Sequence, residues 1–425
     1  MATPSLAMIP SGYKASKVYS VLPESGVGDF DFTRATTATR VNSSGLIEEM
    51  AINVPRLEYP LIDGVVNGCP SLLLEPQRTN LLPYSEDFSN AAWGKARLSV
   101  SANQVISPDG TLNADYIEQQ SGNTSSGGFF DGVIFTAEKY TQSIFVKKKE
   151  KSFIALTENA SSPSLRYTWF DIENGLIGTV NSGHTAKIEN YGNGWYRCSI
   201  TYTAINTGSG YSVFYYLSDT NGSTTVVGSG GLYAWGAQVE AGSFPTSYIP
   251  TNGSTVTRNA ETCNGAGDAD TFNDSEGVLM LEASSNSTTS VIWSVTDGSN
   301  SNAVSLYYGS QGVICDIFSS VGVRTLVATM PIKYRTNMNK FSIKYKSNDI
   351  GLWLNGYELA VNTQTISLSG LNELEGAYGS GSFPFYGSAK QIQYYDSALT
   401  DSELETLTSW TSFTDMANGQ QYSII

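Results

Sequence analysis

The feature that most limits what this chain can fold into is a long series of short segments in which apolar and polar residues alternate. Residues 140–146, 195–202 and 211–217 are examples, and turn-rich stretches such as 190–194 separate them. Alternation with a period of two residues is typical of β-strands with one buried face. Charged residues make up only 15% of the chain and 41 residues are glycine, which also favours strands and tight turns. The sequence therefore predicts an all-β protein.

The length of 425 residues exceeds what one ordinary core supports. We expect an N-terminal extended segment over residues 1–79, followed by two antiparallel β-sandwich, or jelly-roll, domains over residues 80–259 and 260–425. The first segment holds few core-sized residues for its length. It should therefore gain stability by packing on the next domain or on a partner.

One helix is predicted, close to the end of the chain. Thr400 and Glu403 have the spacing of a capping box, and Leu404 and Leu407 follow with helical spacing. A short helix should therefore begin just after Thr400.

Charge and composition exclude several classes of partner. The formal net charge of −15 disfavours nucleic acid and acidic membrane surfaces. No run of about 18 apolar residues and no signal-peptide pattern occurs, which predicts synthesis in a cytoplasm. The four cysteines have no C-x-x-C spacing, so we expect free thiols; they are Cys69, Cys198, Cys263 and Cys315.

Catalytic and metal-binding patterns are sparse. His184 is the one histidine and lies in a turn-like stretch, so a two-histidine metal site is excluded and we expect a surface residue. Glu373 and Glu375 share one face of a predicted strand, but a solvated edge or a cation site is favoured over glycosidase chemistry. No cofactor and no metal site is expected, and the sequence predicts a protein that is not an enzyme.

Calcium is the one ion to consider. Asp297, Asn300 and Asn302 form an oxygen-rich stretch with a single carboxylate, which favours a plain turn over a rim calcium site.

Several stretches resemble proteins of tailed bacteriophages. Residues 71–82 and 84–93 resemble a join found in phage tail-fibre and head-fibre proteins, and residues 9–14 and 32–41 resemble the lead-in of similar proteins from crAss-like and related phages. The domain after the join is similar to family 4/9 carbohydrate-binding modules through residues 193–197 and 233–240. The last domain resembles laminin-G or concanavalin-A-like lectin domains through residues 352–356 and 387–399.

The resemblance implies a non-catalytic virion structural protein, a head or tail fibre, appendage or capsid decoration subunit. It would lie on the virion surface, attach to other virion proteins through residues 1–79, and expose glycan-binding modules for adhesion to host polysaccharide. A homotrimer is implied, although no heptad run supports a coiled coil. The alternatives are a polysaccharide depolymerase or glycoside hydrolase, and a structural spacer without a ligand.

Aromatic residues are the candidates for glycan binding, because sugars lay their C–H faces on exposed rings. Alternate members of one set could line a sheet face of the first sandwich: Tyr167, Trp169, Tyr211, Tyr215 and Tyr216. The second sandwich offers Tyr307, Tyr308, Trp353 and Tyr378. For both sets the alternative is packing in the core or between subunits.

Overall fold

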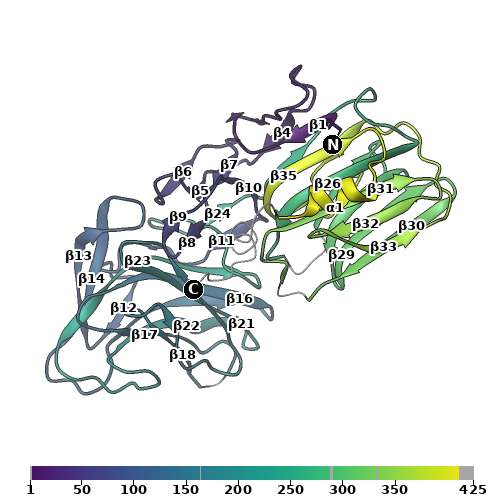
Figure 1. The fold of residues 1–425 in the computed structure, drawn as a ribbon. Helices are drawn as coiled ribbons and strands as arrows, with labels where there is room; N and C mark the ends of the chain where they lie inside the picture. Colours follow the sequence, from purple (N-terminus) through teal and green to yellow (C-terminus); the bar gives the residue numbers. More distant parts are fainter. Residues whose placement is uncertain (1, 163, 288–290, 332–333, 411–425) are drawn as a thin grey trace.

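A computed structural model describes residues 2–162, 164–287, 291–331 and 334–410. The described chain contains 35 β-strands and one α-helix, and every sheet is built from antiparallel pairs. Two β-sandwiches lie side by side, with strands from the N-terminal part of the chain between them (Figure 1). The predicted all-β fold with two antiparallel sandwiches is confirmed.

The first sandwich consists of two six-stranded sheets that enclose one apolar core. Sheet 1 has the strand order β12 (Gly94–Ala96), β15 (Gly128–Phe135), β22 (Gly208–Ser218), β17 (Phe153–Glu158), β18 (Arg166–Asp171) and β19 (Leu176–Ile177). Sheet 2 has the order β13 (Leu98–Ile106), β14 (Leu112–Gln119), β23 (Gly230–Ala241), β16 (Lys139–Lys148), β21 (Trp195–Thr203) and β20 (Thr185–Asn190).

The second sandwich also has two sheets. Sheet 3 has the order β33 (Tyr357–Asn362), β32 (Ile350–Leu354), β31 (Asn339–Lys346), β26 (Glu276–Ser284), β35 (Gly387–Tyr395), β10 (Ser71–Leu74) and β7 (Arg56–Glu58), with β1 (Leu6–Met8) also on β35. Sheet 4 has the order β30 (Gly322–Thr329), β29 (Gly312–Ser319), β28 (Ala303–Gly309), β27 (Val291–Thr296) and β34 (Glu373–Glu375).

The N-terminal segment is part of the second sandwich. Strand β26 occupies one edge of β35, and β1 and β10 share the other edge, pairing Leu6 with Tyr394 and Leu72 with Ala389. Apolar side chains of residues 6–74 also belong to the same buried core as those of both sheets. We expected residues 1–79 to form an extended segment that packs on the next domain or on a partner; in the structure they pack into the second sandwich, where they complete a sheet whose edge would otherwise be unpaired.

Four smaller sheets, one with four strands and three with two, complete the fold of the described chain. A four-stranded sheet runs β2 (Tyr13–Lys14), β3 (Lys17–Val18), β4 (Phe30–Thr33) and β25 (Thr262–Asn264). Three pairs complete the set: β5 (Ala38–Val41) with β6 (Ile47–Met50), β8 (Leu61–Ile62) with β9 (Val65–Val66), and β11 (Arg78–Asn80) with β24 (Val256–Arg258). The chain thus crosses to the first sandwich along β11 and returns along β24.

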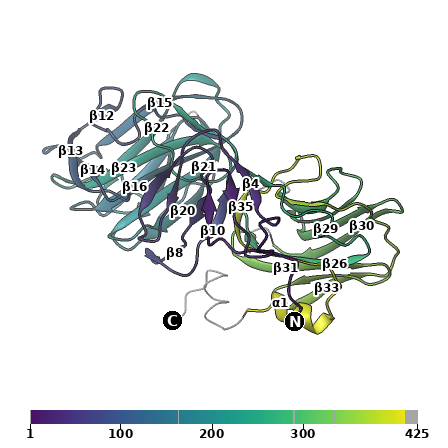
Figure 2. The same cartoon turned by 90° about the horizontal axis from the view of Figure 1, so that it is seen from above.

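Two of the outer sheet faces are covered by other parts of the chain. Ile47 from β6 packs with Phe145, Trp195 and Trp235 on the outer face of sheet 2. Helix α1 (Asp401–Thr408) places Leu404 against sheet 3. Figure 2 shows the N-terminal strands between the two sandwiches and α1 beside the second one.

The helix begins as predicted. Thr400 accepts a hydrogen bond from the Glu403 amide, and Glu403 accepts one from the Thr400 amide at 3.0 Å, so the predicted capping box is confirmed. No helix in the described ranges has the length and apolarity that crossing a membrane requires.

Candidate functional site

The outer face of sheet 1 carries a group of five aromatic side chains, which we call the aromatic face. They are Phe130, Tyr167, Trp169, Phe214 and Tyr216. Their immediate neighbours along the strands, such as Phe129, Phe170 and Tyr215, point into the core between the two sheets. Because side chains alternate along a strand, the five rings point away from that core. None of the five belongs to a buried apolar cluster of the described chain.

The five rings form one continuous row. The centroid of Phe130 lies 5.3 Å from that of Phe214, which lies 6.1 Å from that of Tyr216. Tyr216 is 5.7 Å from Tyr167, which stacks on Trp169 at 5.9 Å with an interplanar angle of 12°. Phe214 and Tyr216 are also nearly parallel, at 16°. The row crosses four strands and contains two near-parallel pairs of rings, while the Phe130–Phe214 and Tyr167–Tyr216 contacts are tilted by 37° and 47°.

Small residues in the neighbouring strands let two of the rings lie close to the sheet. Gly128 pairs with Tyr216, and a Cβ atom on Gly128 would lie 2.6 Å from the Tyr216 ring. Gly94 pairs with Phe130, and a Cβ atom on Gly94 would lie 2.3 Å from the Phe130 ring. The glycines therefore provide the space in which the rings lie over the backbone, as a flat platform requires.

The structure separates the predicted aromatic candidates of the first sandwich. Tyr167 and Trp169 are on the aromatic face, although Trp169 is only 3% exposed and serves as a support for Tyr167. Tyr216, which we also considered, lies on the same face. Tyr215 is fully buried, and Tyr211 packs against the core. Tyr211 and Tyr215 point to the opposite side of β22 and have no place in a binding face.

The candidates in the second sandwich also divide. Trp353 is fully buried beneath α1, and Tyr308 lies in the core, so neither can stack on a sugar. Tyr378 is half-buried and packs edge-on against Phe318 with centroids 5.2 Å apart. Tyr307 is half-buried and donates a hydrogen bond to Asp316 at 2.6 Å. Tyr307 and Phe318 on sheet 4, with Tyr378 beside them, form a smaller and less continuous set of rings than the aromatic face.

Sequence reasoning missed Phe130 and Phe214. Both are apolar residues in segments that alternate like core strands, so nothing distinguishes them from core phenylalanines. The signal that could have found them is their cross-strand pairing, since Phe130 lies opposite Gly94 and Phe214 lies opposite Phe130, and this becomes visible only when strand register is known.

The carboxylate pair Glu373 and Glu375 lies on β34, which pairs with β27. Glu375 is only 4% exposed, and its Oε1 atom has no hydrogen-bond partner among the described residues. Burial, and to a smaller extent the Glu373 carboxylate, raise the pKa of Glu375 to about 7. The expectation of a solvated edge is therefore wrong for Glu375, because the strand is covered by the chain that follows it. In keeping with this, Ser294 on the neighbouring strand hydrogen-bonds the Ala377 carbonyl.

His184 is buried, which corrects the expectation of a surface residue. Its Nε2 atom lies 3.2 Å from Glu158 Oε1, and its Nδ1 atom lies 2.9 Å from the Thr168 hydroxyl. Burial alone would raise the pKa of Glu158, but hydrogen bonds from His184 and Ser161 lower it. All three side chains around His184 are enclosed, so the cluster fastens the 181–184 turn to sheet 1 and offers no access to a substrate.

The oxygen-rich stretch weighed for calcium forms a turn whose side-chain oxygens already accept hydrogen bonds from backbone amides. Asp297 accepts from the Ser299 amide at 2.9 Å, and Asn302 accepts from the Ser369 amide at 3.1 Å. No cluster of three or more histidine, cysteine or acidic side chains suited to a metal ion occurs in the part of the chain that the structure describes. The four cysteines are free, and three of them are buried.

A pocket of about 440 Å³ lies beside the β13–β14 hairpin. Two of its carboxylates are already engaged: Glu86 accepts from Tyr248 at 2.8 Å, and Asp115 accepts from the Phe88 amide at 2.9 Å. Burial raises the pKa of Asp115 to about 6. The acidic groups of this pocket therefore serve local structure, and the pocket is a weaker candidate than the aromatic face.

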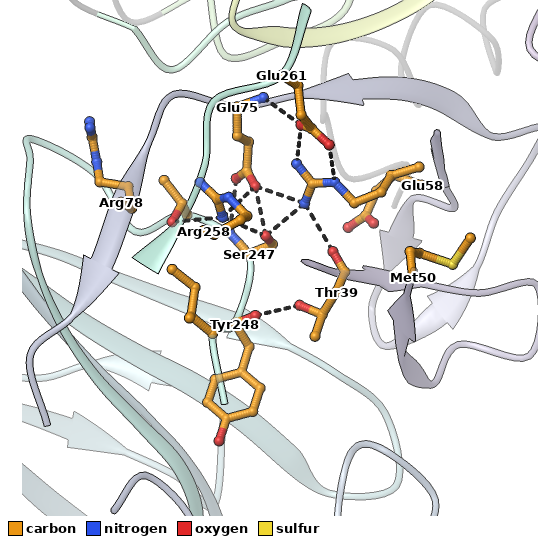
Figure 3. Close-up of polar contacts among 12 residues, drawn as sticks. Thr39, Met50, Glu58, Glu75, Arg78, Ser247, Tyr248, Arg258 and Glu261 are labelled. Carbon is orange, nitrogen blue, oxygen red and sulfur yellow. Dashed lines mark hydrogen bonds and ion pairs between the residues drawn. The ribbon is translucent and has the colours of Figure 1, made fainter. Parts of the chain in front are cut away.

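A buried network of ion pairs lies where the chain passes between the two sandwiches (Figure 3). Arg56 donates to Glu261 at 2.8 Å and to Glu75 at 2.8 Å. Arg34 pairs with Glu261 at 2.7 Å, and Arg258 pairs with Glu75 at 2.8 Å. We call these five residues the junction network. Its three arginines and Glu261 are almost fully buried.

The junction network links segments that are far apart in the sequence. Arg56 begins β7, Glu75 lies between β10 and β11, and Glu261 lies between β24 and β25. Burial alone would raise the pKa of Glu75, but Arg258 and Arg56 lower it to about 2. Because these groups are inaccessible and mutually paired, we assign them the role of holding the crossing strands together.

Comparisons with known proteins identify no family for the chain. No protein-family model and no curated protein matches the sequence. The CBM40 module of the Ruminococcus gnavus IT-sialidase, solved with α2,3-sialyllactose, is 22% identical with a TM-score of 0.30, over 34% of this chain and 88% of that one.

Two further solved structures are similar at the same low level. Domain 4 of AbnA, a GH43 extracellular arabinanase from Geobacillus stearothermophilus in complex with arabinotriose, is 13% identical with a TM-score of 0.29, over 40% of this chain and 84% of that one. Domains LG4-5 of the mouse laminin α1 chain are 11% identical with a TM-score of 0.24, over 66% of this chain and 90% of that one. These values are too low to support an argument about ligand or activity.

Proposed function

We propose that this protein binds glycans without catalysis, and that the aromatic face of sheet 1 is its binding surface. The observation that carries the proposal is the continuous row of five rings, adjacent members of which are no more than 6.1 Å apart, on a sheet face outside every buried cluster. Rings that lie flat on a sheet present their π-faces to the apolar C–H faces of sugars. A row that crosses several strands suits an extended oligosaccharide better than a single sugar.

The absence of catalysis is supported by the placement of the carboxylates. Glycosidases use two carboxyl groups that flank the sugar bond, about 5–10 Å apart. The aromatic rings come from β15, β18 and β22, whereas the carboxylate pair Glu373 and Glu375 lies on β34 of the other sandwich. The depolymerase alternative therefore requires a site away from the aromatic face.

We further propose that the protein acts at a virion surface, as an appendage or fibre subunit that adheres to host polysaccharide. This part rests on the resemblance of residues 71–93 to the join of phage fibre proteins. Contacts to other virion proteins would come from exposed parts of the N-terminal segment, such as the β8–β9 hairpin, where Val65 is 67% exposed. A homotrimer would multiply a weak sugar contact into useful avidity.

The binding proposal is tested with a glycan array followed by calorimetry on the glycans that bind. Tyr216→Ala and Tyr167→Ala should each weaken binding by about fivefold to 150-fold, since stacking on an aromatic ring is worth roughly 1–3 kcal/mol. Tyr357→Ala is the matched control, because Tyr357 is 71% exposed but lies on the second sandwich.

Two results would contradict the proposal. Binding that Tyr216→Ala and Tyr167→Ala leave unchanged would place the site elsewhere, and an array without any bound glycan would favour the spacer alternative. Release of reducing sugar from a host polysaccharide, abolished by Glu373→Gln or Glu375→Gln, would revive the enzyme alternative.

A further inference from the structure

We propose that the glycan bound on the aromatic face carries an acidic group, a carboxylate or a sulfate, and that Arg97 binds it. This inference rests on the proposed function, since it assigns a ligand class to the same surface. It starts from the position of Arg97 beside the row of rings.

Strand register places Arg97 at the edge of the aromatic face. Its neighbour Ala96 pairs with Gly128, and Gly128 pairs with Tyr216. Arg97 itself has a positive φ of 57°, which ends β12 and turns the chain at the start of β13. Ala96 therefore lies in the same cross-strand row as Tyr216, two strands away, and Arg97 follows it directly at the end of β12.

The guanidinium of Arg97 is held in place by one backbone group. Its Nε and Nη2 atoms donate to the Ser126 carbonyl at 3.1 Å and 2.8 Å. Ser126 is two residues before Gly128, so the anchor belongs to the same strand region that lies under Tyr216. An arginine fixed in this way loses little further freedom when it binds a ligand.

Arg97 has unused binding capacity. The residue is exposed, and no carboxylate forms an ion pair with it within the described ranges. Its Nη1 group has no hydrogen-bond partner among those residues. Two other exposed cations of the first sandwich differ in this respect, since Lys149 and Lys187 are paired with glutamates.

The charge of Arg97 reaches the rings of the aromatic face. Burial raises the pKa of Tyr167 and Tyr216, and the positive charge of Arg97 opposes that rise at both hydroxyls. Two acidic residues of sheet 1 already accept hydrogen bonds from nearby backbone amides: Asp171 Oδ1 accepts from the Glu173 and Asn174 amides at 3.0 Å, and Asp131 Oδ1 accepts from the Gly132 amide at 2.7 Å.

These observations favour an anionic sugar. Guanidinium groups bind carboxylates and sulfates through two parallel hydrogen bonds, and such charge-assisted bonds are stronger than neutral ones. The chain as a whole has a net charge of −15, which repels acidic polymers. An unpaired, anchored arginine beside the rings is therefore what an acidic glycan needs in order to approach this surface.

The test is an array of neutral, uronate-containing, sialylated and sulfated glycans, followed by calorimetry at low and high salt. Acidic glycans should be enriched among those bound by the wild-type protein. Arg97→Gln should weaken the binding of acidic glycans about tenfold and remove the salt dependence of that binding. Arg97→Lys keeps the positive charge and should lose less of this affinity. Lys139→Gln is the matched control, because it removes one exposed positive charge from the other sheet of the same sandwich.

The outcomes separate this inference from the proposed function. If neutral glycans bind equally well, with an affinity that Tyr216→Ala abolishes and Arg97→Gln leaves unchanged, the acidic ligand is refuted and the aromatic face stands. If no glycan of any class binds, both are refuted. The uronate, sialylated and sulfated spots distinguish a carboxylate from a sulfate ligand.

Discussion

Replacing Arg56 by methionine tests the structural role of the junction network. The guanidinium donates to Glu261 at 2.8 Å, to Glu75 at 2.8 Å, to Ser247 at 2.7 Å and to the Thr39 carbonyl at 2.9 Å. Methionine fills much of the same volume but leaves these acceptors without their common donor. Removing one partner of a buried ion pair costs about 3–5 kcal/mol.

Two features of the structure set the expected size of this loss. Arg34 remains paired with Glu261 and Arg258 remains paired with Glu75, so neither carboxylate is left without a cation. We therefore expect a loss near the lower end of that range, about 3 kcal/mol in the free energy of unfolding.

The assay is equilibrium unfolding in urea, followed by tryptophan fluorescence and by circular dichroism. Arg324→Met is the matched control, because Arg324 donates only to backbone carbonyls on the exposed side of sheet 4. It should change stability by less than about 0.5 kcal/mol. A loss below about 1 kcal/mol for Arg56→Met, similar to the control, would refute the assigned role of the network.

Three further predictions concern acid stability, the N-terminal segment and the platform glycines. The pKa of Glu75 is about 2 in the folded protein against an ordinary value of 4.5. The ionised carboxylate should therefore contribute about 3 kcal/mol to the free energy of unfolding above pH 4.5, and this contribution should be lost as the pH falls toward 2. In Glu75→Gln, urea unfolding should show a weaker dependence of stability on pH over this range. Deleting residues 1–79 should leave the second sandwich misfolded or aggregated, because β1, β7 and β10 are lost from sheet 3, and a folded, monodisperse product by light scattering would contradict this. Gly128→Ala should weaken glycan binding by tilting the Tyr216 ring, whereas Gly132→Ala, whose Cβ would meet nothing closer than 3.9 Å, should bind like the wild type in calorimetry.

Local patterns in the sequence predict the strands and the helix, and long-range pairing is what they miss. The capping box at Thr400 and Glu403 depends on four consecutive residues and is found as expected. The pairing of Leu6 with Tyr394 joins the two ends of the chain, and no local signal marks it. The scarcity of core residues in the N-terminal segment predicted that it packs on something else, but not that its partner is a sheet built from the other end of the chain.

The candidate site was predicted only in part, and the missing information was again long-range. Alternation showed that neighbours such as Tyr215 and Tyr216 face opposite ways, but it did not show which of the two faces the core. That choice depends on which sheet the strand joins and on which face of that sheet packs against the other sheet, and here the Tyr215 side of β22 faces the shared core. Trp353 and His184 were misjudged because helix α1 packs over Trp353 and because the turn that carries His184 packs against Glu158 and Thr168 of sheet 1.

A crystal structure of the protein with an oligosaccharide that binds on the array tests the central claim most directly. The account predicts sugar rings stacked on Tyr216 and Phe214, with Tyr167 at one end of the chain of sugars. Density for the oligosaccharide on sheet 4, beside Tyr307 and Tyr378, with the aromatic face of sheet 1 empty, would contradict it.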